Sequence, residues 1–375
     1  MVSIATSDNF IAIAKGLYIN YYDFSLDKCI EITSQNKSKE TDYISDIAIS
    51  SDSKYLAVST SASKQLIIYS LPLGEILKNI VLPRSSSKIR FATDNHQILI
   101  ADKSGDVLIF NIKIESSGTK LLGHLSLLLD VLQTYDGKYI ISCDRDEKIR
   151  VSNYPNTYNI QTFCLGHKEF VNHIEILPHD NKYLTSTSGD GTIKCWDYVN
   201  GLLCYSIDTS FDVNETHLQE QFCKIMDDEG IEVNTLPIVH YAICKLNETS
   251  SLLAVAVYTY NVLLFYSLQT INAKFIHKLE QKLKLHSFPD AVKFHNSSIV
   301  LYNDSNSNIT IYNVLYCDGK ISLELYKTIN VFENNITTSE VKENFDFIKV
   351  LYKRKFDNVQ EYQERKRQRL EKSSQ

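Results

Sequence analysis

The sequence predicts an all-β fold, a seven-bladed β-propeller followed by a basic C-terminal tail. Two observations support this: a repeat near 42 residues, and a pair of strand-like runs in each repeat. In each copy a polar turn residue precedes a strand-opening aliphatic residue by four positions. The clearest copies begin 42, 42 and 44 residues apart, at Asp52, Asp94, Asp136 and Asp180. A four-stranded propeller blade uses about 40 to 45 residues, so the spacing is that of blades.

Three weaker copies complete the set of seven. They begin near Asp8, at Glu248 and at His295. A second apolar run follows in the copies, as at 66–69 and 193–196, so each repeat supplies two adjacent strands. The uncharged stretch 251–268 is rich in β-branched and aromatic residues, and we interpret it as two strands joined by a turn, not as a membrane span.

The spacing also predicts the domain boundaries. Asp180 and Glu248 lie 68 residues apart, about 25 more than one blade needs, which places an insertion at 209–237 between blades five and six. Its many acidic residues favour disorder. The propeller is expected to span 1–340. Residues 341–375 form an amphipathic, basic tail, predicted as helical from Tyr352, Phe356, Val359 and Tyr362 at steps of four, three and three.

Composition narrows the function. The formal net charge of −6 argues against a surface that grips nucleic acid everywhere, because phosphate binding needs a basic field. The eight cysteines include no Cys-x-x-Cys pair, which favours reduced, mostly buried thiols over disulfides or zinc. The first 20 residues show no secretory signal.

No motif for catalysis or metal binding is present. The sequence contains no His-Glu-x-x-His, Gly-x-Ser-x-Gly or glycine-rich phosphate loop. Isolated histidines such as His173 and His179 are expected at the surface rather than in a metal site. We therefore expect no catalytic residue and no metal ligand in this chain.

The fifth repeat shows the full WD-repeat pattern. It runs from Gly166-His167 through Ser188-Gly189-Asp190 to Trp196-Asp197. WD repeats use such residues in a buried hydrogen-bonded network, which the resemblance assigns to His167, Ser186 or Ser188, Asp190 and Trp196. The fourth repeat keeps Gly123-His124 and Asp146 but has Ser152 in place of the tryptophan.

Two charged clusters and the tail are candidate contact sites. In the run 143–152, alternation along a strand would point Lys148 and Arg150 outward and bury Ile149 and Val151. Lys168 and Glu169 follow the Gly-His pair at what would be the same rim. Each cluster could form a docking edge or only a solvated charged rim. The basic end of the tail could be solvated, direct nuclear entry or contact RNA phosphates.

These three segments resemble one family in particular. Asp144–Ser152, Phe163–Val171 and the tail sequence 351–359 are similar to the non-catalytic WD-repeat subunit of tRNA (guanine-N7) methyltransferase. The resemblance is strongest over 123–198 and in the tail, about 100 residues in all; elsewhere the chain fits only as blades.

The resemblance implies a heterodimer with a separate catalytic subunit. That partner would bind S-adenosylmethionine and methylate a guanine in the tRNA variable loop, while this chain binds no cofactor and no membrane. The implied location is the nucleus, with the cytoplasm not excluded. The resemblance assigns partner contacts to Arg145, Lys148, Arg150, Lys168 and Glu169. The candidate RNA contacts are Lys353, Arg354, Lys355, Arg365, Lys366 and Arg367.

A rival interpretation is a scaffold of another complex, such as a ubiquitin-ligase adaptor. Such adaptors often carry Trp-Asp-x-Arg, but here the run is Trp196-Asp197-Tyr198-Val199. The missing arginine weakens the rival.

Overall fold

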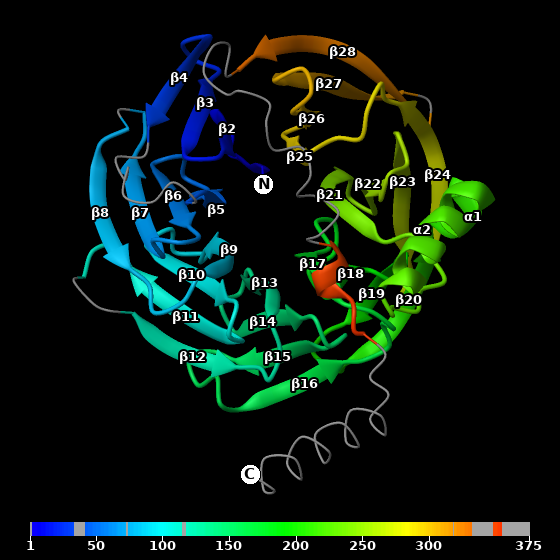
Figure 1. Ribbon diagram of the computed structural model, residues 1–375, viewed down its shortest axis with the longest axis horizontal. Coiled ribbons are helices and arrows are strands. Elements are labelled where there is room, and N and C mark those ends of the chain that lie inside the picture. The colour runs from blue at the N-terminus through cyan, green and yellow to red at the C-terminus, as the bar shows by residue number, and fades with distance from the viewer. Residues whose placement is uncertain are drawn as a thin grey trace, which may run out of the picture.

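Seven four-stranded antiparallel sheets form a ring in the computed structural model, with the first strand of each sheet innermost and the fourth outermost (Figure 1). The structure describes residues 2–33, 42–72, 74–114, 118–317, 319–331 and 348–354. The prediction of an all-β, seven-bladed propeller is confirmed.

Each blade is built from four strands that follow one another in the sequence. Blades one to three contain β1 (Val2–Thr6), β2 (Phe10–Lys15), β3 (Tyr18–Asp23), β4 (Lys28–Thr33), β5 (Ile44–Ile49), β6 (Tyr55–Thr60), β7 (Gln65–Ser70), β8 (Ile76–Val81), β9 (Ser86–Phe91), β10 (Gln97–Asp102), β11 (Asp106–Asn111) and β12 (Thr119–Gly123). Blades four and five contain β13 (Leu128–Gln133), β14 (Tyr139–Asp144), β15 (Ile149–Asn153), β16 (Ile160–Cys164), β17 (Val171–Ile176), β18 (Tyr183–Ser188), β19 (Thr192–Asp197) and β20 (Leu202–Asp208). Blades six and seven contain β21 (Ile238–Asn247), β22 (Ser250–Val257), β23 (Val262–Ile271), β24 (Lys274–Lys284), β25 (Ala291–His295), β26 (Ser298–Asn303), β27 (Asn308–Cys317) and β28 (Lys320–Asn330).

The sequence repeat marks the two middle strands of each blade. The strand-opening aliphatic residues lie in the second strands, for example Leu56 in β6 and Leu184 in β18. The second apolar runs form the third strands, as 193–196 does in β19. Middle strands are covered on both faces by neighbouring blades, whereas outer strands such as β8 expose alternate residues. The pattern is strong in the middle strands because both of their faces are buried.

The stretch 251–268 forms β22 and β23, joined by a turn, as expected. Within the described ranges, no helix is long and apolar enough to cross a membrane.

Side-chain contacts join blade seven to blade one. Because every sheet consists of consecutive strands, no strand is exchanged between the first and last blades among the described residues. Instead, Thr6 Oγ1 donates to the carbonyl of Phe294 at 2.8 Å, and Lys15 pairs with Asp304. Ile11 and Ile13 pack with Val300 and other residues of blade seven in one apolar cluster.

Charged side chains on the inner strands tie neighbouring blades together around the axis. Arg90 on β9 donates from Nε and Nη2 to both carboxylate oxygens of Asp130 on β13, at 3.0 and 2.7 Å, and from Nη1 to Glu175 on β17 at 2.7 Å. Asp130 also accepts the backbone N–H of Ile174 at 3.1 Å. Three blades are thus joined by charge-assisted hydrogen bonds, which compensate for burying these charges.

The insertion after blade five contains two helices. Residues 210–213 form α1 (Ser210–Val213) and residues 216–228 form α2 (Thr216–Asp228). The expectation of disorder is wrong for this segment. Phe222 and Met226 on α2 are buried with Ile231 and Val233 in the largest apolar cluster. The acidic composition concealed a helix whose few apolar residues share one face.

A candidate partner-docking surface on blades four and five

A linear hydrogen-bonded network braces blade five. Trp196 Nε1–H donates to Ser186 Oγ at 2.8 Å, Ser186 pairs with His167 Nε2 at 2.7 Å, and His167 Nδ1 lies 3.0 Å from Asp190 Oδ2. Since a carboxylate only accepts, the proton of His167 resides on Nδ1 and Ser186 donates to Nε2. Ser186, not Ser188, is the network serine; the Ser188 hydroxyl donates to the carbonyl of Glu169.

Burial sets the protonation states in this network. Burial lowers the pKa of His167, and the opposing influence of Asp190 is smaller. Burial alone would raise the pKa of Asp190, but hydrogen bonds from His167 and Thr192 together hold it below its ordinary range. The network therefore contains a neutral imidazole and an ionised carboxylate.

Blade four contains a second network of the same form. His124 Nδ1 lies 2.8 Å from Asp144 Oδ2 and His124 Nε2 lies 2.8 Å from Ser142 Oγ. The WD-repeat pattern of the fourth repeat predicts Asp146 as the aspartate that contacts His124, and that prediction is wrong. Asp144 takes the role because its other oxygen accepts the backbone N–H groups of Asp146 and Lys148, which close the turn after β14.

Lys148 and Lys168 are exposed at the rim formed by the turns of blades four and five. Their backbone N–H groups are held by Asp144 and Asp190 at 3.0 and 2.9 Å. In the part of the chain that the structure describes, neither lysine side chain forms an ion pair or hydrogen bond. Both ammonium groups are therefore exposed and accessible to a partner.

Arg150 does not point outward freely, contrary to the prediction from strand alternation. Its guanidinium donates to Ser152 Oγ at 2.9 Å and to the carbonyls of Gly123 and Thr157 at 3.1 and 3.0 Å. Burial lowers its pKa. The two apolar neighbours on β15, Ile149 and Val151, are buried as expected. The long side chain of Arg150 thus folds over Ser152, the residue that stands where blade five has Trp196.

Glu169 and Arg145 complete the predicted contact residues. Burial, together with nearby Glu147 and Asp190, raises the pKa of Glu169 to about 7, and Lys353 opposes the shift. These electrostatic neighbours show that the turns of blades four and five share one rim. Arg145 is half-buried, and its Nε lies 4.0 Å from Asp146 Oδ1.

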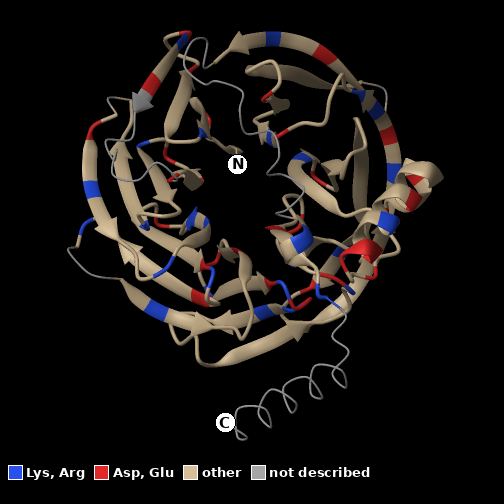
Figure 2. Ribbon diagram, viewed as in Figure 1, with Lys and Arg blue, Asp and Glu red and all other residues tan. Residues whose placement is uncertain are grey.

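The C-terminal segment 348–354 lies against this rim. Residues 348–351 form one helical turn beside β17 and β18 (Figure 1). Lys353 Nζ lies 2.6 Å from Glu147 Oε1 and 3.9 Å from Asp146 Oδ1, and Arg354 lies 4.0 Å from Glu229. Figure 2 shows acidic and basic residues gathered where this segment meets the propeller. Lys353, chosen from the sequence as an RNA contact, is thus part of an ion pair on the rim.

The remaining tail candidates, Lys355 and Arg365 to Arg367, lie outside the described residues, as does most of the predicted tail helix. We define the docking surface as residues 145–148, 168–169 and 353. Sequence reasoning missed that Lys353 belongs to it, because the contact joins positions about 200 residues apart.

Two histidines expected at the surface are instead partly buried and bridge blades five and six. His173 Nε2–H donates to the carbonyl of Val239 at 3.2 Å, and burial lowers its pKa to about 3. His179 bonds Ser251 Oγ and Thr270 Oγ1 at 2.7 and 3.0 Å. Both have structural partners, so neither is available as a metal ligand.

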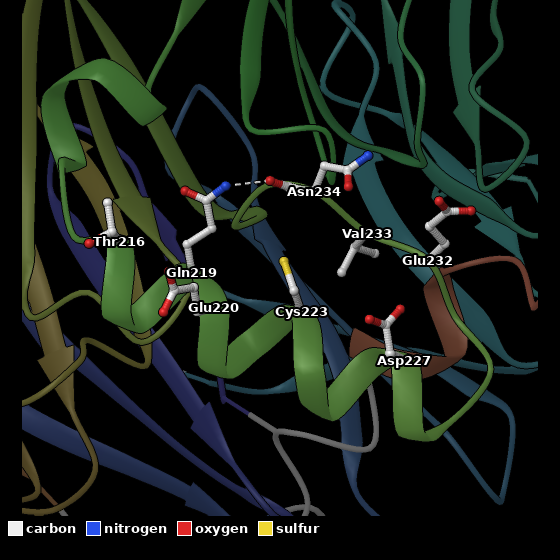
Figure 3. A pocket seen from close by; sticks show the side chains of 8 residues that line it. All are labelled: Thr216, Gln219, Glu220, Cys223, Asp227, Glu232, Val233 and Asn234. Carbon is white, nitrogen blue, oxygen red and sulfur yellow. Dashed lines mark hydrogen bonds between the residues drawn. The ribbon is translucent and has the colours of Figure 1, made fainter.

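An open groove of about 460 Å³ lies between α2 and the segment that follows it (Figure 3). Its lining includes the carboxylates of Glu220, Asp227 and Glu232 and no lysine or arginine. A phosphate or nucleic-acid backbone would be repelled there.

No group of three or more potential metal ligands occurs within the described ranges. All eight cysteines are free, but only Cys143, Cys164 and Cys195 are fully buried. Cys29, Cys204 and Cys317 are exposed, so the expectation that the thiols are mostly buried holds only in part.

The ring of seven sheets and the two histidine networks define a WD-repeat propeller. The chain belongs to the family described as tRNA methyltransferase TRM82 WD40 domain, which it matches over residues 27–120 and 111–310. The family resemblance noted in the sequence is confirmed.

Curated relatives agree with this assignment. A relative from Drosophila mojavensis is 30% identical over 348 residues, covering 88% of this chain and 81% of the relative. One from Drosophila melanogaster is 42% identical over 162 residues, covering 42% and 38%. Both are named "tRNA (guanine-N(7)-)-methyltransferase non-catalytic subunit wuho", and the chain is a non-catalytic member of this family.

Solved structures share the fold at low identity. A chain in "Crystal Structure of Mitotic Checkpoint Complex" superposes with a TM-score of 0.66 at 13% identity, covering 84% of this chain and 86% of that chain. "Structure of U3-55K" gives 0.62 at 17%, covering 80% and 86%. These matches support the propeller alone.

Proposed function

We propose that this chain docks and stabilises the catalytic subunit of a tRNA (guanine-N7) methyltransferase, using the docking surface on blades four and five. The observation that carries the proposal is the pair of exposed lysines, Lys148 and Lys168, held by their backbones and unpaired by their side chains within the described residues. Their ammonium groups suit acidic groups on a partner.

In this proposal the partner binds the cofactor and the propeller binds the partner. S-adenosylmethionine would bind to the partner, since this chain has no glycine-rich loop before a helix. The methylated guanine would lie in the tRNA variable loop. The basic residues after 354 would contact tRNA phosphates in the assembled complex, and the expected location is the nucleus.

Arg150 and Glu169 take different roles within this proposal. Arg150 has a structural role next to the docking surface, because its guanidinium already donates to Ser152, Gly123 and Thr157. Glu169 can accept a hydrogen bond from the partner, which would favour its ionised form.

The test is the double charge reversal Lys148→Glu with Lys168→Glu in the full chain. Exposed positions of this kind change folding stability by roughly ±0.5 kcal/mol each. At an interface with acidic groups the same change juxtaposes like charges and costs several kcal/mol. Calorimetric titration with the catalytic subunit should show lost binding while the melting temperature stays near that of the unaltered chain.

Two outcomes separate the proposal from its rival. If the double variant binds the methyltransferase normally, the docking surface is assigned wrongly. If the unaltered chain fails to bind a methyltransferase but co-purifies with ubiquitin-ligase components, the scaffold of another complex is the better description.

A further inference from the structure

The C-terminal segment 348–354 is held by three separate parts of the molecule. Ile348, Leu351 and Tyr352 are 7%, 5% and 4% exposed, although the segment follows the last blade by many residues. Tyr352 O–H donates to the carbonyl of Gly189 in blade five at 2.9 Å. Its ring packs edge-on against Phe170 with the centroids 5.0 Å apart. A segment this well buried has a fixed position on the rim.

The insertion supplies the other side of this contact. The ring centroids of Phe222 on α2 and Tyr352 lie 6.3 Å apart, and Met226 belongs to the same apolar cluster. Just after the helix, Glu229 pairs with Lys349 at 2.6 Å. The insertion and the segment therefore bury each other, which accounts for the order of an otherwise acidic helix.

From this anchor, Lys353 reaches across to blade four. The residue it pairs with, Glu147, has a backbone φ of 69°, in the left-handed region that costs a non-glycine residue about 1 kcal/mol or more. Pairing opposes the burial of Lys353 and raises its pKa. Asp146, Glu147 and Glu169 all interact with Lys353, which offsets the repulsion among these carboxylates at the rim.

We propose that the insertion 209–237 is a clasp that fixes segment 348–354 on the rim, and that Lys353 so positioned completes the docking surface for the catalytic subunit. This rests on the proposed function. Lys353 acts through its ion pair with Glu147, which holds the turn that carries Lys148 in place for an acidic partner face. Tyr352 and Phe222 are positioning residues, because they act only through the place of Lys353.

The proposal gives a physical role to the strained turn of blade four. Strained backbone persists where the surrounding structure over-determines it, and such positions concentrate at functional sites. Here the ion pair with Lys353 and the two backbone hydrogen bonds to Asp144 hold Glu147 beside Lys148. A turn already held in its bound form loses less entropy on docking.

The experiment compares Lys353→Met, Glu147→Gly and Tyr352→Ala in the full chain, with dissociation constants for the catalytic subunit measured by calorimetry. Each should weaken binding by roughly tenfold, because each frees the turn that carries Lys148 and that turn must then be ordered on docking. Glu147→Gly relieves the left-handed backbone, so its melting temperature should equal or exceed that of the unaltered chain. Loss of affinity without loss of stability is a result that a merely structural role does not produce.

Two controls sharpen the comparison. Lys245→Met removes a surface lysine paired at 2.8 Å with Glu248 on blade six, and its dissociation constant should be unchanged. Tyr352→Phe keeps the ring in the clasp and should retain most of the affinity that Tyr352→Ala loses. Hydrogen exchange over 348–354 and 144–149 should rise together in Tyr352→Ala.

The outcome that overturns the inference is distinct from failure of the proposed function. If the unaltered chain binds and the double charge reversal abolishes binding, yet Lys353→Met and Glu147→Gly bind as tightly as the unaltered chain, the clasp has no role in docking. Tighter binding of Lys353→Met would mean that the segment competes with the partner, which also overturns it. If the unaltered chain does not bind at all, the proposed function itself fails.

Discussion

Blades four and five solve the same structural problem with different residues. In both, a histidine contacts a serine hydroxyl and an aspartate within 3.0 Å: His124 with Ser142 and Asp144, and His167 with Ser186 and Asp190. Both networks join the loop before the first strand to the second strand, and in blade five Trp196 extends the network to the third strand. The comparison teaches that the histidine network, not the tryptophan, is the common bracing unit.

The two blades differ in what surrounds that unit. Blade five fills the space with the fully buried Trp196 and places Gly191 in the left-handed position of its turn, at φ 73°. Blade four has Arg150 folded over Ser152 and Glu147 at φ 69°. Blade five thus has an apolar side chain and a glycine at these two positions, while blade four has a charged side chain and a strained turn. The blade with the strained turn is the one that contributes residues 145–148 to the docking surface.

The largest effect should come from Trp196→Ala. Removing a large, fully buried aromatic side chain from a core costs about 3 to 5 kcal/mol, and here it also removes the hydrogen bond to Ser186. Chemical denaturation should show this loss. If the loss were below that of a surface substitution, the indole would not be part of the bracing of blade five.

Arg150→Ala tests whether the arginine does for blade four what the tryptophan does for blade five. It removes three charge-assisted hydrogen bonds, and one such bond is worth about 1.5 to 3 kcal/mol. We expect a loss of that order, smaller than for Trp196→Ala because Arg150 is partly exposed. An unchanged denaturation midpoint together with weaker partner binding would show that Arg150 contacts the catalytic subunit directly.

His167→Ala and His124→Ala should be alike if the two networks are equivalent. Each leaves a buried serine and aspartate without their histidine partner, at about 1 to 3 kcal/mol. The comparison is by thermal and chemical unfolding of the two variants side by side. A much smaller loss for His124→Ala would show that blade four depends on Arg150 more than on its histidine.

The smallest effect concerns pH and Glu169. Its pKa in the folded chain, about 7, lies above the ordinary 4.5, so the folded state favours the protonated acid. Wild-type stability should therefore decline, relative to Glu169→Gln, as pH rises from about 4.5 through about 7. Melting temperatures of both proteins from about pH 5 to about pH 8 measure this difference. A constant difference across that range would contradict the raised pKa.

The sequence alone was enough to define the fold and its repeats. The 42-residue spacing and the apolar runs identified both middle strands of blades two to seven and the second strand of blade one, since these strands are largely buried on both faces. The motif in 166–197 predicted the blade-five network, because its members lie at fixed positions within one hairpin and the loop before it. The long interval after Asp180 located the insertion.

Predictions from local sequence patterns were wrong where contacts between distant parts of the chain set the surroundings of a residue. Strand alternation predicted an outward Arg150, but its guanidinium is held by the carbonyls of Gly123 and Thr157 from outside its own strand. His173 looks like an isolated surface residue in sequence, yet the next blade buries it against Val239. The acidic composition of the insertion suggested disorder because its partner, segment 348–354, is more than 100 residues away.

The sequence by itself therefore determined the features that depend on periodicity and local spacing. These are the seven blades, their middle strands, the insertion site and the family. What only the tertiary structure decided is which charges are free. Lys148 and Lys168 remain exposed while Arg150 and Lys353 are occupied, and the difference comes from neighbours contributed by other blades and by the C-terminal segment. Electrostatic roles depend on distances of a few ångströms between side chains, and folding brings those side chains together across up to 206 residues.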